Sequence, residues 1–268
     1  MAIPIPRDPD LDLHDVPRHW LANNAAATAI SNGINLLFPA GERFFVRSVH
    51  RFADQVADPV LREQVRAFFK QEGHHARAHD RFNDVLRAHG FQIDDFLATY
   101  ERISRWIEAR MPAKMNLAGT AAAEHFTAIL ADGAFSKGIL DDLHPKMREL
   151  LAWHAAEEIE HKAVAFDVLR AVDPSYALRM AGLAYATVLL GSYWFAASVM
   201  LMRQDKLGLR GALRQLAEMR RREPVIRRVF VRGIRQYARR DFHPDDNDNA
   251  HLAARWFQAH GMPFTEAA

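Results

Sequence analysis

Four segments of this sequence place carboxylates on apolar stripes that have the spacing of an α-helix. In one of them, Phe68, Glu72, His75, His79 and Phe82 follow one another at intervals of three or four residues, so two aromatic residues bracket the polar groups on one helix face. A helical bundle normally fills such positions with apolar residues. The pattern therefore predicts helices that direct acids into a shared core.

The other three segments repeat this arrangement. Their stripes are Phe38, Glu42, Phe45, Val49 and Phe52; Leu117, Ala121, Glu124, Ala128 and Ala131; and Leu151, His154, Glu158, His161, Ala165 and Val168. Burying unpaired carboxylates costs several kcal/mol for each group, which is more than a marginally stable domain can absorb. Cations must sit among them, and two metal ions are the simplest counter-charge.

The predicted metal ligands are Glu42, Glu72, His75, Glu124, His154, Glu158 and His161. A single Glu-x-x-His pair would more often be a solvated surface pair, and a single glutamate a surface or capping acid. Here the two pairs and two lone glutamates occur together, which favours a dinuclear site. The sequence contains no cysteine, so only oxygen and nitrogen ligands are available. We expect two metal ions, and iron, manganese and zinc are all compatible with these ligands.

Several other polar residues lie near these stripes. His79 is one turn beyond His75, and we expect it to hydrogen-bond a ligand rather than coordinate a metal, a plain core histidine being the alternative. Glu157 and Glu160 lie about 100° and 200° around the helix from Glu158 and should point elsewhere. His74, His125 and Asp167 are also off the stripes.

The fold class predicted from these patterns is all-α. Gly and Pro fall at the edges of long segments with helical spacing, and no run of alternating β-branched residues suggests a strand. The predicted helices cover 39–56, 59–89, 95–110, 113–131 and 145–171. The predicted organisation is an N-terminal extension over 1–38, a four-helix bundle over 39–172, and an apolar helix followed by basic helices over 173–268.

The segment 180–202 is free of charged residues and lies between Arg179 and Arg203, so it is long enough to cross a bilayer. Its glycines and alanines suit a helix packed inside protein or in a homodimer interface equally well. The following segment, 203–240, holds thirteen lysines and arginines against three acids, which predicts a positive surface suited to lipid head groups. Nucleic acid is an unlikely partner because no reading element with interleaved aromatics is present.

The N-terminal residues Met1 to Asp15 lack both the basic region and the apolar region of a signal peptide. We therefore expect a cytoplasmic protein, and membrane association if 180–202 contacts lipid.

The order Glu42, Glu72-x-x-His75, Glu124, Glu158-x-x-His161 resembles that of ferritin-like di-iron carboxylate proteins, in which two helices each supply one Glu and two supply a Glu-x-x-His. The resemblance implies a ferritin-like four-helix bundle with additional C-terminal helices. With His154 included, the last helix is similar to that of non-haem di-iron arylamine N-oxygenases. The stretches 41–45, 71–75 and 153–158 also look like a bacterial family called predicted metal-dependent hydrolase.

These resemblances imply an O₂-activating di-iron oxidoreductase that hydroxylates, desaturates or N-oxygenates a hydrophobic or amphipathic small molecule with electrons from a reductase. The alternative is a dinuclear metal-dependent hydrolase, in which paired metals activate water without a reductant. A third hypothesis is a non-catalytic metal-binding or membrane-associated protein whose working surface is 203–240.

Overall fold

The computed structural model describes residues 2–220 and 225–264. Within these ranges the chain forms helices and no strand, which confirms the all-α prediction. The helices are α1 (Ala25–Asn35), α2 (Phe38–His50), α3 (Pro59–Ala88), α4 (Asp94–Arg110), α5 (Ala113–Ser136), α6 (Pro145–His161), α7 (Val164–Val172), α8 (Tyr176–Gln204), α9 (Leu209–Arg220), α10 (Val225–Tyr237) and α11 (Ala250–Ala259).

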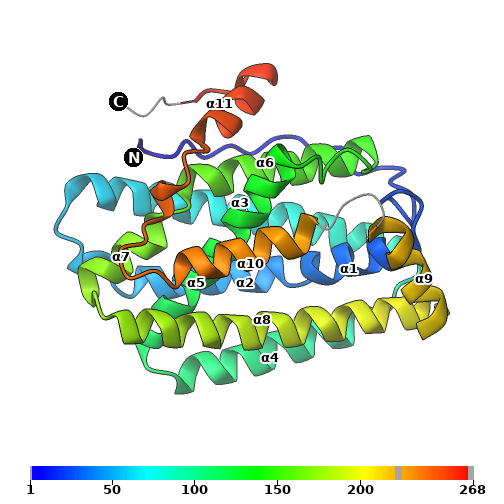
Figure 1. The fold of residues 1–268 in the computed structure, drawn as a ribbon, viewed down its shortest axis with the longest axis horizontal. Helices are drawn as coiled ribbons and strands as arrows, with labels where there is room; N and C mark the ends of the chain where they lie inside the picture. The colour runs from blue at the N-terminus through cyan, green and yellow to red at the C-terminus, as the bar shows by residue number, and fades with distance from the viewer. Residues whose placement is uncertain (1, 221–224, 265–268) are drawn as a thin grey trace.

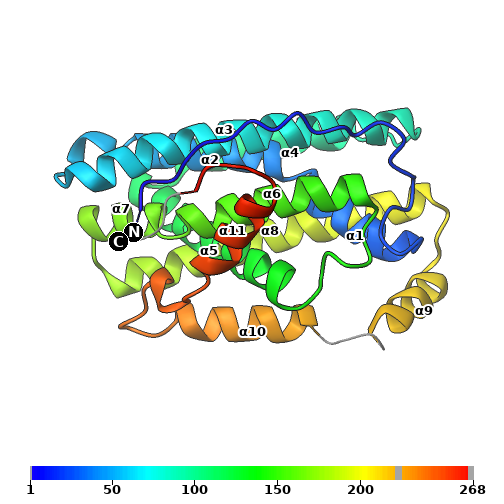
Figure 2. The same cartoon turned by 90° about the horizontal axis from the view of Figure 1, so that it is seen from above.

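Four of these helices, α2, α3, α5 and α6, pack against one another and enclose the centre of the molecule (Figures 1 and 2). Their starts follow from local sequence. At α3, for example, the side chain of Asp58 accepts a hydrogen bond from the Val60 amide at 2.8 Å, and Pro59 occupies a position where no N–H is needed.

Apolar residues close the space between these four helices at both ends. Along α3, Val65 and Phe68 belong to one buried cluster, whereas Ala78 and Phe82 belong to a second. The predicted ligands of α3, Glu72 and His75, lie between the two clusters. The predicted acids are therefore buried, with apolar packing on either side.

The predicted helix over 145–171 is interrupted. Lys162 and Ala163 form a turn that separates α6 from α7. The buried Lys162 ammonium donates to the Asn247 carbonyl at 2.6 Å and to Asn249 Oδ1 at 2.7 Å. These contacts with the C-terminal segment stabilise Lys162 at the break, and no local sequence signal indicates them.

The segment assigned as an N-terminal extension contains α1 and is anchored to the bundle. Arg7 donates to Glu157 Oε1 at 3.2 Å and to Glu160 Oε2 at 2.8 Å, and its guanidinium lies 3.5 Å from the centre of the Phe257 ring on α11. This run of chain lies along α3 in Figure 2. Residues near both ends of the chain thus support α6.

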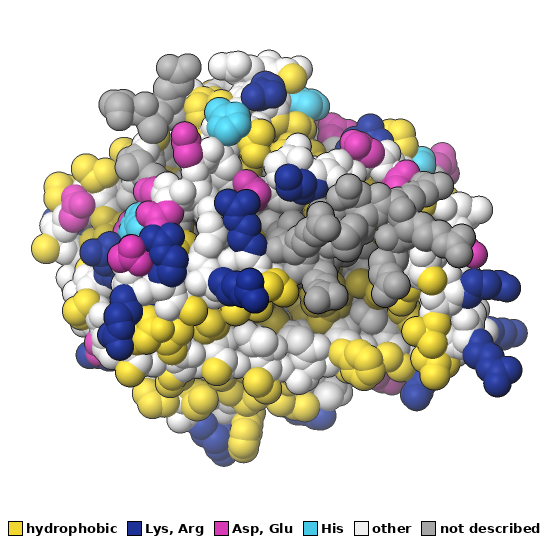
Figure 3. All heavy atoms as spheres, in the orientation of Figure 1, with side chains coloured by type: hydrophobic (Ala, Val, Ile, Leu, Met, Phe, Trp, Pro, Cys, Tyr) yellow, Lys and Arg dark blue, Asp and Glu magenta, His cyan; other side chains and the backbone are white. Residues whose placement is uncertain are grey.

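Helix α8 lies outside the four central helices, on α1 and α5, with α4 beside it (Figure 1). Its inner face approaches α5 closely: a Cβ added at Gly182 would lie 2.5 Å from the Ala118 backbone. Its outer face is open, because Val188 is 64% and Phe195 72% exposed. Figure 3 shows hydrophobic side chains gathered along this edge.

Helix α8, which contains the apolar segment 180–202, is not buried in the core, since 22% of its most apolar stretch is buried. Among the described residues it is the single helix long and apolar enough to cross a membrane, which is weak evidence because core helices pass the same test. The segment predicted to carry a basic surface, 203–240, includes α9 and α10. Its residues 221–224 lie outside the described residues.

Candidate metal centre

The seven predicted ligands converge on the space between the four central helices. Glu42 comes from α2, Glu72 and His75 from α3, Glu124 from α5, and the remaining three from α6. All seven are buried, with relative exposures between 0% and 4%. Helical spacing of three and four residues directs each set to one face, so each helix contributes without bending.

The side chains form two adjoining groups. In the first, His161 Nε2 lies 3.1 Å from Glu72 Oε1 and 3.3 Å from Glu124 Oε2. In the second, His154 Nε2 lies 2.9 Å from Glu158 Oε1 and 3.9 Å from Glu42 Oε1. Each group combines imidazole nitrogen with carboxylate oxygen, the donors that iron, manganese and zinc accept.

Glu158 and Glu72 lie between the two groups. Glu158 Oε1 is 3.7 Å from His75 Nδ1, whereas its other oxygen is 3.5 Å from His161 Nε2. Glu72 Oε1 is 3.9 Å from His75 Nδ1 and also faces His161. Both carboxylates therefore face His75 as well as His161.

Most of the facing atoms have no hydrogen-bond partner among the described residues. They are both carboxylate oxygens of Glu42, Glu72 and Glu124, Glu158 Oε2, His75 Nδ1 and His161 Nε2. Leaving buried donors and acceptors unpaired costs about 1–3 kcal/mol each, and more for charged groups. A cluster of such atoms pointing at one locus fits a pair of cations.

The pKa values in the site show the same shortage of positive charge. Burial, followed by repulsion from neighbouring carboxylates, raises the pKa of Glu42 and of Glu72 well above the usual range. Burial also raises the pKa of Glu124 to about 7. Burial opposes protonation of His161, yet the surrounding carboxylates raise its pKa well above normal. Without cations Glu42, Glu72 and Glu124 retain protons, and bound cations would remove that need. Burial opposes ionisation of Glu158, yet His161 and His154 hold its pKa well below the usual range.

Two of the histidines are oriented by hydrogen bonds on the ring nitrogen that faces away from the cluster. His161 Nδ1 lies 2.9 Å from Gln71 Oε1. His75 Nε2 lies 3.0 Å from Glu157 Oε2, and Glu157 is in turn paired with Arg7. Because the amide and carboxylate oxygens accept, these nitrogens carry protons, and Nε2 of His161 and Nδ1 of His75 are the nitrogens that face the cluster, where a bound cation would take the place of any further proton.

A chain of side chains orients the third histidine in the same way. His154 Nδ1 lies 2.5 Å from His79 Nε2, and His79 Nδ1 lies 2.6 Å from Asn35 Oδ1. Since Asn35 Oδ1 only accepts, His79 donates to it and His154 donates to His79, so His154 Nε2 is the nitrogen that faces Glu158 Oε1, at 2.9 Å. His79 thus makes the expected hydrogen bond to a candidate ligand, although its ring is also close enough to Glu42 and His154 to form a metal-sized group.

The other polar residues near the stripes lie elsewhere. His74 bonds the Arg7 carbonyl at 2.5 Å, His125 the Gly233 carbonyl at 2.8 Å, and Asp167 lies 2.9 Å from His243. Glu160 pairs with Arg7.

Sequence analysis missed the supporting roles of Gln71, Glu157, Asn35 and Arg7. Gln71 and Glu157 are fully buried next to predicted ligands, but a glutamine or glutamate off the apolar stripe gives no signal that separates it from a surface residue. Only the packing of α6 on α3 and on the N-terminal segment brings them to the histidines.

Replacing Gln71 with leucine should lower metal affinity about 10- to 100-fold, because it removes the acceptor that holds the His161 ring. Equilibrium dialysis against a competing chelator measures the change. Gln71→Glu keeps the acceptor oxygen but loses the amide nitrogen that donates to Glu160 Oε2 at 2.9 Å, so it should lose less affinity than the leucine variant without matching the wild type. Equal loss in both variants would show that the acceptor oxygen does not hold the His161 ring.

Fold and site together define an all-α protein with buried His/Glu clusters able to hold metal ions. The family described as predicted metal-dependent hydrolase matches residues 5–248. This match covers nearly the whole chain, so the protein belongs to that family. No curated protein and no solved structure shows significant similarity to it.

Proposed function

We propose that this protein is an enzyme that works with two metal ions held by the seven converging side chains. The observation that carries the proposal is the set of buried carboxylate and imidazole atoms that face one another without hydrogen-bond partners among the described residues. Four helices contribute to this set, in the order found in ferritin-like di-iron carboxylate proteins, and this order supports a ferritin-like bundle and a dinuclear site.

Within the proposed centre, His161, Glu72 and Glu124 would hold one ion, and His75, His154 and Glu42 the other. Glu158 is shared, because its two oxygens face different histidines. Bound ions would supply Lewis acidity, lowering the pKa of a water molecule and polarising a substrate oxygen. The outer hydrogen bonds described above keep the lone pair of each imidazole directed inward.

The reaction class we favour is hydrolysis. The description of the family supports it, and it requires only the polarising chemistry that such a donor set provides. The His154–His79–Asn35 chain offers a path on which a proton could be held away from the cluster. Sequence resemblance alone had favoured oxygen activation, for which the comparisons give no support.

Oxygen activation remains a second candidate on one observation. Glu42 lines an apolar cavity whose other polar side chains are Thr127, Thr187 and Trp194, and dry surroundings of this kind suit oxidation of an unreactive carbon or nitrogen. This candidate requires iron and an electron-donating reductase. It leaves the ligand assignment unchanged.

Two parallel assays separate the candidates. If hydrolysis is the function, protein loaded with zinc or manganese should turn over a neutral ester under nitrogen, without reductant, and Glu158→Ala should lose at least about 100-fold in rate. If oxygen activation is the function, only iron-loaded, reduced protein should react, with rapid O₂ consumption and a transient absorption change absent from the zinc form. O₂ consumption without anaerobic turnover would overturn the hydrolase assignment.

Two further expectations remain proposals. The open outer face of α8 suits contact with lipid or with a second copy of the chain. Cytoplasmic location likewise rests on the N-terminal sequence alone.

A further inference from the structure

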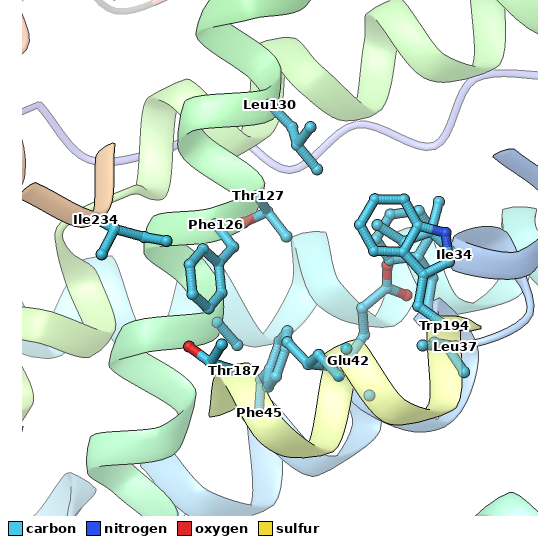
Figure 4. Close-up of a pocket in the computed structure, with 15 residues that line it drawn as sticks. Ile34, Leu37, Glu42, Phe45, Phe126, Thr127, Leu130, Thr187, Trp194 and Ile234 are labelled. Atoms are coloured by element: carbon cyan, nitrogen blue, oxygen red, sulfur yellow. The ribbon is translucent and has the colours of Figure 1, made fainter. Parts of the chain in front are cut away.

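A cavity of about 250 Å³ adjoins the candidate metal centre. It lies between α2, α5, α8 and α10, and Figure 4 shows the aromatic rings of Phe45, Phe126 and Trp194 around it. The Glu42 side chain reaches the same space. One candidate ligand is thus shared between the cavity and the carboxylate cluster.

Apart from Glu42, the polar side chains that line this cavity donate hydrogen bonds to backbone carbonyls. Thr127 donates to the Glu124 carbonyl at 2.9 Å, Thr187 to the Leu183 carbonyl at 2.6 Å, and Trp194 to the Ile30 carbonyl at 2.7 Å. No lysine, arginine or histidine is among the described residues that line it. A charged ligand group placed away from Glu42 would therefore be buried without a partner.

We propose that this cavity binds the uncharged, apolar body of the substrate and presents its reacting group at Glu42. The inference rests on the proposed function and specifies its substrate class: a neutral molecule with an alkyl chain or ring system, such as a neutral ester of that size. A substrate with a charged tail would find no counter-charge in the cavity.

The size of the cavity limits the apolar body. A cavity of about 150 Å³ lined by aliphatic and aromatic side chains accommodates benzene. Scaling that relation to about 250 Å³ gives room for about ten carbon atoms.

Access to the cavity runs past α8. Thr187 and Gly191 line it and are themselves exposed, so they mark its mouth. A Cβ added at Gly191 would meet no atom within 4 Å. A large side chain can therefore be introduced at Gly191, at the mouth of the cavity, without a backbone clash.

Displacement of the neutral fluorescent probe 1-aminonaphthalene, whose ring system has about ten carbon atoms, by straight-chain alcohols from butanol to dodecanol tests the inference on metal-loaded protein. Affinity should rise about fourfold for each added methylene and stop rising near ten carbons. Gly191→Phe should weaken probe binding at least tenfold, since its ring would stand at the mouth of the cavity. Ser192→Phe places the same ring on the exposed neighbour and should change binding less than twofold.

Metal content of both variants is measured alongside and should equal that of the wild type. Probe binding that is unaffected by Gly191→Phe, or affinity that grows without limit up to dodecanol, would place the ligand on the open face of α8 and overturn the inference. Wild-type protein that binds the probe as expected but takes up no metal would instead contradict the proposed function alone.

Discussion

Replacing Glu158 with alanine is expected to reduce bound metal from two ions per chain to less than one and to abolish activity. The reason is its place between the two groups of ligands, with Oε1 toward His154 and His75 and Oε2 toward His161. Loss of hydrogen bonds that only orient ligands lowers metal affinity 10- to 100-fold, so loss of a shared ligand should cost more than about 100-fold. Elemental analysis after dialysis measures the metal.

Glu149→Ala is the matched control, since Glu149 lies exposed on the same helix. It should retain full metal content and activity. Circular dichroism checks that the metal-free Glu158→Ala protein is folded, because the change also removes the carboxylate that faces His154 and His161. A Glu158→Ala protein that binds two ions with wild-type affinity would remove this residue from the ligand set.

Metal removal should reverse the pH dependence of stability. Burial and then neighbouring carboxylates raise the pKa of Glu42 and Glu72 well above the usual range, so the folded metal-free protein still holds protons at pH values where the unfolded chain has released them. The raised pKa of His161 acts in the same direction. Between about pH 5, where unfolded glutamates have ionised, and about pH 7, near the raised pKa of Glu124, the metal-free protein should therefore become less stable as pH rises.

Each proton retained only in the folded state changes the unfolding free energy by about 1.4 kcal/mol per pH unit. For a chain of this size, one such proton corresponds to a fall in melting temperature on the order of 5 °C over that range. In the metal-loaded protein the ions replace the protons, and metal binding strengthens as the ligands deprotonate, so its melting temperature should hold or rise.

Calorimetry of chelated and metal-loaded protein at the same pH values makes the comparison. Glu42→Gln and Glu72→Gln, which cannot ionise, should each flatten the slope of the metal-free form. A metal-free protein whose melting temperature rises between pH 5 and pH 7 would show that these carboxyls are ionised and otherwise compensated.

The sequence predicts that the seven candidate ligands come together, because each of them lies on a stripe of apolar residues with helical spacing. A buried acid on such a stripe has few explanations, so Glu42 and Glu124 were informative even though each stands alone. The start of α3 was also predictable, because Asp58 caps the helix and Pro59 occupies its first position.

Features that depend on contacts between distant segments were not predictable in this way. Arg7 reaches Glu157 across the sequence, and Asn35 reaches His79, without any local pattern. The turn at Lys162 likewise depends on the C-terminal segment. Helix α8 shows the opposite difficulty: its composition suits a core helix, a membrane helix and an interface helix alike, and only its place outside α1 and α5 shows that one face is uncovered.

Anomalous X-ray diffraction from crystals of the metal-loaded protein shows whether the seven side chains hold two metal ions. We predict two anomalous peaks per chain between α2, α3, α5 and α6, one beside His161 and one beside His75 and His154, with Glu158 contacting both. Crystals of fully loaded protein with no peak at this locus, or with metal bound only by other residues, would contradict it.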